Sequence, residues 1–169
     1  MNPNSMTPVD WAKRPIVEKY ADFSGRAPRA EYWWYALGLI IAFIVLSIVE
    51  SITGLKGMVF GFYGPLTALL WLATIVPGIA VGVRRLHDTN RSAWWLLLIV
   101  PYLLVAILSV MALRSGGGLA ALGAVGLLSI VGLVCAIIML VLMVLPGTPG
   151  ENRYGPNPYG NATGAVPAE

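Results

Sequence analysis

Residues 33–52 of this chain read WWYALGLIIAFIVLSIVESI, with no charged side chain between Tyr35 and Val49. A helix needs roughly 20 apolar residues to cross the ~30 Å hydrocarbon core of a bilayer, and this stretch has that length. The aromatic side chains of residues 33–35 are typical of a membrane interface. The stretch therefore predicts a transmembrane helix. We expect Glu50, near its far end, to extend outward to the headgroups, and a buried functional carboxylate is the alternative.

Further apolar stretches of similar length follow along the chain. They cover residues 65–83, 93–113 and 121–145. A single helix over 93–145 would be about 80 Å long at ~1.5 Å per residue, far more than a bilayer, so we expect a hairpin that turns at the glycines 116–118. Pro101 leaves a broken or re-entrant element open as the alternative to two full crossings. With the first stretch, these predict four transmembrane helices.

The composition indicates a membrane protein. Of the 169 residues, 57% are hydrophobic and 11% are charged, whereas about 25% are charged in an average soluble domain. We therefore expect an all-α integral membrane protein with its four transmembrane helices in one small bundle. The chain has one cysteine, Cys135, and one histidine, His87, which excludes an intramolecular disulfide and argues against a zinc site. No cofactor, metal or nucleic-acid partner is expected.

Polar segments flank the apolar stretches. We expect disordered tails at residues 1–8 and 159–169, which leaves 9–158 as a single membrane domain. The first 30 residues contain no short apolar stretch, so no cleavable signal peptide is expected, and the first span can act as an uncleaved signal-anchor.

Residues 9–24 are expected to form a short N-terminal amphipathic helix. Ile16, Tyr20 and Phe23 fall at i, i+4 and i+7, which places them on one face, and Pro15 suits a first turn. Such a helix can lie in the headgroup region or pack on the rest of the protein, and the sequence leaves both open.

Small residues in the second span suggest a packing surface. Gly78 and Gly82 form a small-xxx-small pair that would let a neighbouring helix approach closely, although glycine is also simply common in membrane helices. Pro77 is expected to kink the same helix.

The cationic residues are distributed unequally about the four spans. Nine of the 11 Lys and Arg residues lie in the N-terminal segment, the 84–92 connection and the C-terminal tail. Only Lys56 and Arg114 lie on the other side. The positive-inside rule then places the N- and C-termini in the cytoplasm.

Three polar motifs adjoin the spans. They read FSGRAPRAEYW at 23–33, RRLHDTNRSAWW at 84–95 and GTPGENRYG at 147–155. Together they closely resemble the bacterial inner-membrane family known as domain of unknown function 805, the YhaH-like proteins, over roughly residues 11–158. The resemblance implies a small multi-pass protein of the bacterial inner membrane. It implies no particular reaction, because the family has no assigned activity.

With four spans, the three motifs lie at the cytoplasmic surface and can converge on one site. Starting at Arg84, titratable or charged residues fall at i, i+3, i+4 and i+7, which would share one face of a continuing helix. Arg84 would pair with Asp88 at i, i+4, and Arg85 would point toward the headgroups. The candidate residues are Arg26, Arg29, Glu31, Arg84, Arg85, His87, Asp88, Arg91, Glu151, Asn152 and Arg153.

Three hypotheses for this cluster remain open. The arginines and carboxylates can form an ion-pair lattice that fixes the helix ends and the tail. They can instead bind an anionic group, such as a phospholipid headgroup, a lipid-linked phosphate or an acidic partner, because Arg contacts phosphate bidentately and basic pockets on the cytoplasmic side hold anionic lipids. Thirdly, His87 and Asp88 can serve as acid and base in a small transporter or membrane-embedded enzyme.

The sequence favours the first hypothesis, then the second. No nucleophile, metal or nucleotide motif is present, and no ionisable residue lies in the middle of a span, where a proton relay would need one. A non-enzyme is therefore favoured over an enzyme. The expected partners are the lipid bilayer, an anionic phospholipid, and either a second copy of the chain or another membrane protein.

Overall fold

The computed structural model describes residues 5–59, 63–114, 116 and 118–160, and these residues are helical with connecting turns. The elements in chain order are α1 Pro8–Val17, α2 Arg29–Ile52, α3 Pro65–Asp88, η2 Ala93–Leu98, α4 Ile99–Arg114 and α5 Leu119–Val144. Within the described part, four helical stretches are long and apolar enough to cross a membrane: α2, α3, η2 with α4, and α5. The all-α prediction with four spans is confirmed.

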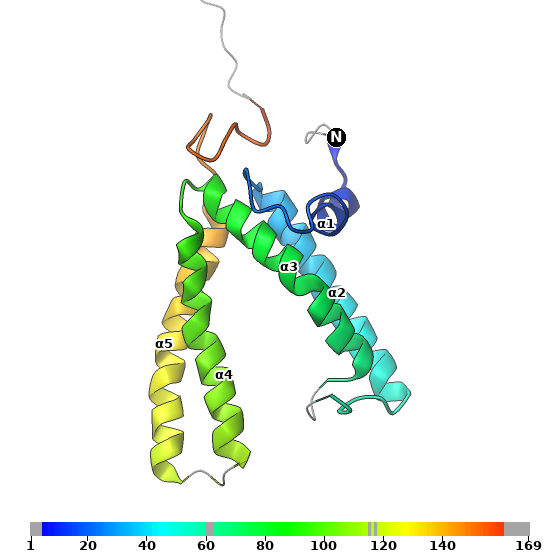
Figure 1. The fold of residues 1–169 in the computed structure, drawn as a ribbon, viewed down its shortest axis with the longest axis vertical. Helices are drawn as coiled ribbons and strands as arrows, with labels where there is room; N and C mark the ends of the chain where they lie inside the picture. The colour runs from blue at the N-terminus through cyan, green and yellow to red at the C-terminus, as the bar shows by residue number, and fades with distance from the viewer. Residues whose placement is uncertain (1–4, 60–62, 115, 117, 161–169) are drawn as a thin grey trace, which may run out of the picture.

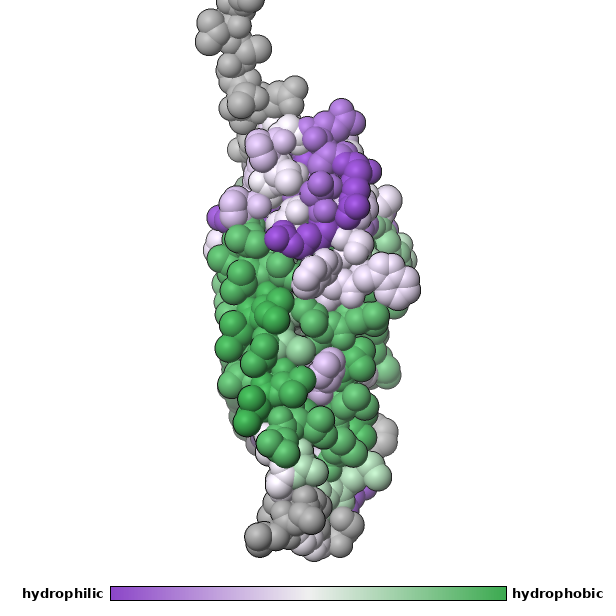
Figure 2. All heavy atoms as spheres, turned by 90° about the vertical axis from the view of Figure 1, so that its left-hand side faces the viewer, coloured by the Kyte–Doolittle hydropathy of each residue, from purple (hydrophilic) through white to green (hydrophobic). Residues whose placement is uncertain are grey.

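The long helices form two hairpins (Figure 1). In one, α2 packs against α3, and in the other, α4 packs against α5. The hairpins meet where α1, the end of α3 and the C-terminal segment lie, and they diverge toward the opposite end. We call the meeting point the charged end. Figure 2 shows hydrophilic residues gathered there and a mostly hydrophobic face below it.

The observed helix bounds extend the predicted spans at the charged end. Helix α2 begins at Arg29 rather than residue 33, directly after Pro28, which takes the N-cap position in an extended conformation. Helix α3 continues past residue 83 to Asp88. The prediction limited both spans to their uncharged residues. The charged residues next to them have partners within the protein, and they therefore remain in the helices.

The third span is continuous through the proline that left its structure open. A 3₁₀ segment, η2, leads directly into α4 at Ile99. Pro101 therefore lies in the first turn of α4, just after the change from 3₁₀ to α-helix, and does not interrupt the span. Helices α4 and α5 run side by side as two full-length elements (Figure 1).

The N-terminal helix differs from its prediction. It begins at Pro8, because the Thr7 Oγ1 accepts a hydrogen bond from the Asp10 amide and the Asp10 carboxylate accepts one from the Thr7 amide. This capping box orders residues assigned to the tail. The helix ends at Val17, so Tyr20 and Phe23 lie beyond it and do not extend its apolar face.

Helix α1 packs on the rest of the protein. Trp11 and Pro15 are its buried residues, and Pro15 lies inside the helix rather than in its first turn. The ring of Tyr159 lies edge-on to Trp11 with 6.3 Å between ring centroids, so this residue is not part of a free tail. The predicted disorder of residues 1–4 and 161–169 lies outside the described residues.

The small-residue pair of α3 faces two neighbours rather than one. A Cβ at Gly78 would lie 3.7 Å from the Tyr35 hydroxyl of α2, and a Cβ at Gly82 would lie 3.4 Å from Leu96 of η2. Gly78 thus faces helix α2 and Gly82 faces η2, so each glycine accommodates a different element.

Glu50 caps a helix instead of extending outward. Its side chain is buried, Oε1 accepts hydrogen bonds from the Leu66 and Thr67 amides at 2.6 and 2.9 Å, and Oε2 accepts one from the Thr67 hydroxyl at 2.8 Å. These amides are unpaired donors at the start of α3. A Cβ at Gly64 would lie 2.2 Å from the Glu50 Cδ, so glycine is required there. The expectation of an outward-facing carboxylate is therefore wrong.

We predict that Glu50→Ala lowers the thermal unfolding midpoint in detergent, because the Leu66 and Thr67 amides lose their acceptor and the Thr67 hydroxyl loses one of two. Gly64→Ala should act in the same direction. Glu151→Ala is the control, because Glu151 is exposed and makes no ion pair within the described residues. An unchanged midpoint for Glu50→Ala would show that α3 does not need this cap.

Candidate functional site

The last turns of α3 form the centre of the charged end. Every residue from Ala80 to Asp88 is buried, although this stretch carries two arginines, a histidine and an aspartate. The loop before α2 covers it from one side and the segment after α5 covers it from the other. These α3 side chains therefore meet protein groups, not lipid headgroups.

The first of two ion-pair groups joins α3 to α1 and α2. The Glu31 carboxylate accepts from Arg84 Nη2 at 2.6 Å and from Arg14 Nη1 at 3.0 Å. Side chains of Glu31 and Arg84 are both 0% exposed. Arg84 also donates to the backbone carbonyl of Asp22. One carboxylate thus holds arginines from two other helices.

The loop that supplies this carbonyl is itself held by charge. Asp22 accepts hydrogen bonds from the Ser24 amide at 3.0 Å and from its hydroxyl at 2.5 Å, and it pairs with Lys19 at 3.0 Å. The hydrogen bonds from Ser24, followed by those from Lys19, hold the pKa of the Asp22 carboxyl well below its usual range. Because the folded pKa is depressed, this contribution to stability is complete above the ordinary carboxyl pKa and is lost only in strong acid.

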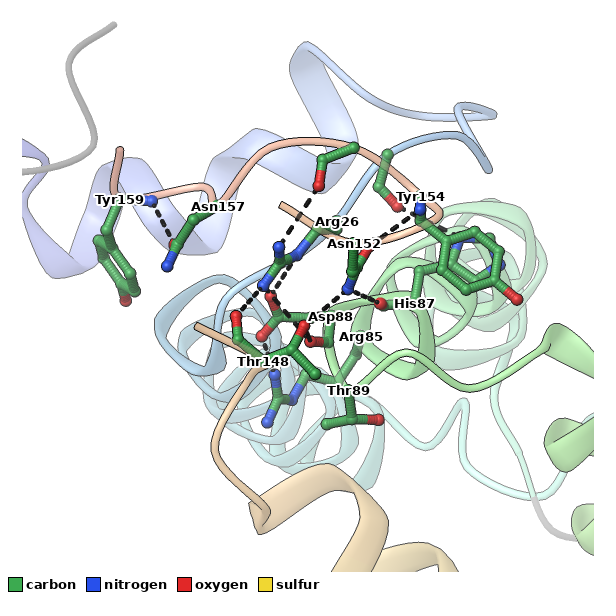
Figure 3. Close-up of polar contacts among 12 residues, drawn as sticks. Arg26, Arg85, His87, Asp88, Thr89, Thr148, Asn152, Tyr154, Asn157 and Tyr159 are labelled. Atoms are coloured by element: carbon green, nitrogen blue, oxygen red, sulfur yellow. Dashed lines mark hydrogen bonds and ion pairs between the residues drawn. The ribbon is translucent and has the colours of Figure 1, made fainter. Parts of the chain in front are cut away.

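The second ion-pair group is centred on Asp88. Its Oδ1 accepts from Arg26 Nε at 2.9 Å, and its Oδ2 accepts from Arg85 Nη1. Figure 3 shows the two guanidinium groups on either side of the carboxylate. Both oxygens of Asp88 are engaged by cations, so the carboxylate is not free to act as a general base. The geometry therefore does not favour the acid–base hypothesis.

Arg26 binds the C-terminal segment, residues 146–155, and Arg85 binds the end of α5 just before it. Arg26 donates to the carbonyls of Thr148 and Gly150, each at 2.6 Å. Arg85 donates from Nε to the Met143 carbonyl at 3.1 Å and from Nη2 to the Leu145 carbonyl. The excess positive charge of the Asp88 group is thus met by backbone oxygens.

The same segment caps the end of α3. The Thr148 amide donates to the Asp88 carbonyl at 2.8 Å, and the Asn152 side chain donates to the His87 carbonyl at 3.0 Å. The last carbonyls of a helix have no amide donor within the helix, so they take their donors from outside it. A Cβ at Gly147 would lie 2.2 Å from Asp88 Oδ2, so only glycine fits beside the carboxylate.

His87 is held between the first and third motifs. Its Nδ1 lies 3.2 Å from the Gly25 carbonyl, and its ring stacks on Tyr154 with 3.7 Å between centroids and 6° between planes. Since a carbonyl only accepts, Nδ1 carries the proton in this arrangement. The ring therefore connects the loop before α2 to the C-terminal segment.

Several pairings expected from the sequence are wrong. Arg84 pairs with Glu31 and not with Asp88, and Arg85 is buried instead of facing headgroups. Helix α3 ends at Asp88, and Asn90 takes a left-handed φ of 59°. Arg91 therefore lies beyond the expected helix face.

Two residues of the third motif stay at the surface. Glu151 is exposed and has no ion pair within the described residues, so it does not join the predicted lattice. Arg153 donates to the Asn90 carbonyl at 3.1 Å and lies over the Tyr154 ring. Of the third motif, Asn152 is the predicted residue that contacts α3 directly.

Sequence reasoning missed Arg14, Gly147 and Thr148. Arg14 lay outside the three motifs, and nothing in its spacing pointed to Glu31. Gly147 and Thr148 begin the third motif. Gly147 acts by having no side chain, and Thr148 acts through its backbone atoms. The position of Gly147 within a shared motif was the available signal.

A pocket of about 220 Å³ opens beside this lattice. Its lining includes Arg26, Arg29, Asp88, Asn157 and Tyr159. Arg29 donates from Nε to the Leu145 carbonyl at 3.2 Å, and its two terminal nitrogens have no partner in the described part of the chain. Burial, and next the Asp88 charge, raise the pKa of the Tyr159 phenol, so it stays a neutral donor. The pocket thus presents hydrogen-bond donors suited to an anion.

Comparison with known proteins assigns this chain to a family. The model of the family described as protein of unknown function (DUF805) matches residues 20–156. The chain belongs to this family. Inner membrane protein YhaH of Escherichia coli strain K12 is 34% identical over 151 residues, which are 89% of this chain and 97% of the relative. Inner membrane protein YhaI of the same strain is 38% identical over 102 residues, or 60% of this chain and 81% of the relative.

No solved structure matches the chain. Together with the four membrane-spanning helices, the relatives identify this DUF805 member as a multi-pass protein of the inner membrane. Among the described residues, no group of three or more His, Cys, Asp and Glu could hold a metal ion.

We predict that Asp88→Ala strongly destabilises the protein, because Arg26 and Arg85 would both stay buried without their carboxylate. Breaking a buried ion pair costs about 3–5 kcal/mol. The measurement is the unfolding midpoint in detergent, with Arg91→Ala as the control at the same end. If the two variants unfold together with the wild type, the Asp88 pairs do not stabilise the fold.

Proposed function

We propose that this DUF805 member binds an anionic phospholipid at the cytoplasmic surface of the inner membrane, and that Arg29 contacts the headgroup phosphate. The observation that carries the proposal is the difference between the two arginines of the pocket. Arg26 is saturated by Asp88, Thr148 and Gly150. Arg29 keeps both terminal nitrogens free of partners in the described residues.

The depth of Arg29 supports a membrane lipid as the ligand. Arg29 is the first residue of α2, and the exposed Trp33 and Trp34 follow one turn later. Such aromatic residues mark the membrane interface. At ~1.5 Å per residue, Arg29 lies about 6 Å beyond Trp33, which is headgroup depth. Guanidinium groups bind phosphate bidentately, and basic pockets on the cytoplasmic side bind anionic lipid headgroups.

The charge distribution supports the orientation. Nine of the 11 Lys and Arg residues belong to the charged end, while Lys56 and Arg114 lie at the other. The charged end therefore faces the cytoplasm by the positive-inside rule, and both termini face it too. The ion-pair lattice would have a structural role there, since it places α2, α3 and the C-terminal segment around the pocket.

A C-terminal reporter fusion tests the orientation. We predict activity from a reporter that works in the cytoplasm and none from one that requires export. A fusion after residue 56 should show the opposite behaviour, because the α2–α3 connection lies at the other end of the helices. A C-terminal reporter that is active only after export would contradict the proposal.

Native mass spectrometry tests the ligand. We predict that wild-type protein incubated with phosphatidylglycerol retains bound lipid and that Arg29→Ala retains about tenfold less, which corresponds to ~1.4 kcal/mol. Arg29→Lys keeps the charge without the bidentate geometry and should lie between them. Arg91→Ala is the matched control and should bind as wild type does. The absence of retained lipid in the wild type, or equal losses in Arg29→Ala and Arg91→Ala, would refute the proposal.

A further inference from the structure

An apolar groove of about 370 Å³ lies between the two hairpins. One wall is the start of α2, with Tyr32 and Trp33, and the other is formed by η2, α4 and α5. On α5 the lining residues are Ala136, Met139, Leu140 and Met143. The groove is thus lined from both hairpins, which diverge away from the charged end (Figure 1).

The groove lies directly next to the polar pocket that contains Arg29. On α2, Arg29 lines the pocket, while Tyr32 and Trp33, at i+3 and i+4, line the groove. Residues with this spacing share one helix face. On the opposite wall, Met143 ends the groove and Pro146 begins the pocket. Each wall thus passes from the polar pocket to the apolar groove in the same direction.

The side chain at the junction matches the chemistry of a lipid. Tyr32 follows Arg29 by about one helical turn and lines the apolar groove, and its hydroxyl has no hydrogen bond within the described residues. A glycerophospholipid carries its ester groups at this level, between phosphate and acyl chains. A free inorganic anion would use Arg29 and leave Tyr32 and the groove unoccupied.

The groove runs along part of one leaflet of the membrane. Its lining on α5 extends from Ala136 to Met143, which is about 10 Å at ~1.5 Å per residue. Half of the ~30 Å hydrocarbon core is about 15 Å. One acyl chain extending from a headgroup at Arg29 would therefore have most of its length along the groove.

We infer that the ligand is an intact anionic glycerophospholipid, with its phosphate on Arg29 and one acyl chain in the groove between the hairpins. The inference rests on the proposed function, which requires only the headgroup contact. It adds that the apolar groove determines which molecules bind. A headgroup without acyl chains therefore binds far more weakly than the complete lipid.

The test fills the groove without touching Arg29. Ala136→Trp places a large side chain in it, and Ala124→Trp, at an exposed position of the same helix, is the matched control. We expect Ala136→Trp to lose about tenfold of the phosphatidylglycerol bound by wild type, or ~1.4 kcal/mol, and Ala124→Trp to lose none. Unfolding midpoints close to wild type confirm that both variants are folded.

A second measurement needs no variant. Wild-type protein is incubated with long-chain phosphatidylglycerol, with short-chain phosphatidylglycerol, and with glycerophosphoglycerol, which is the headgroup alone. We expect binding to decrease in that order, and an excess of glycerophosphoglycerol should not displace the long-chain lipid. Equal binding of all three, or displacement by the headgroup alone, would overturn the inference.

The outcomes separate the two proposals. If Arg29→Ala loses the lipid while Ala136→Trp binds as wild type does, the acyl-chain inference fails and the headgroup proposal stands. If Arg29→Ala binds as wild type does, the headgroup proposal fails and the inference fails with it. If the wild type is a dimer without lipid that Ala136→Trp converts to a monomer, a second copy of the chain occupies the groove, and the inference is overturned.

Discussion

The arrangement of this protein depends on the carboxylate of Asp88. It accepts hydrogen bonds from Arg26 in the loop before α2 and from Arg85 of its own helix. Gly147 has no side chain, and the C-terminal segment can therefore lie against this carboxylate. Segments separated by 62 positions along the chain are joined by one residue. Because both arginines are buried, the carboxylate determines their hydrogen-bonded arrangement as well as their position.

A lattice of this kind is needed because the membrane supplies little force to hold helices together. Lipid chains are as apolar as leucine, so spans associate through packing and polar contacts. Polar contacts here concentrate at the charged end, with Glu50 and Thr67 holding the other end of the α2–α3 hairpin. Between the hairpins, the described residues offer no comparable contact below the charged end, and there the hairpins diverge.

Length and hydropathy alone were sufficient to predict the four spans, since few structures other than a helix can cross a bilayer. The pairings could not be predicted in the same way. A charged residue at the end of an apolar stretch can face headgroups or protein, and Glu50 and Arg85 were assigned wrongly for this reason. The partner of Arg84 is 53 positions away, on another helix, and the sequence pattern reports only neighbours on the same helix. Gly147 acts through an absent side chain, which no charge pattern reveals.

The lattice and the proposed lipid site share one atom. The Leu145 carbonyl oxygen accepts a hydrogen bond from Arg85 and another from Arg29 Nε. Because Arg85 is held by Asp88, that carbonyl has a fixed position, and it directs the guanidinium of Arg29 toward the pocket. Within the described residues, this one hydrogen bond orients Arg29 and leaves its two terminal nitrogens available. The lattice around Asp88 thus gives Arg29 a defined orientation, and two donors directed at one side suit a phosphate group.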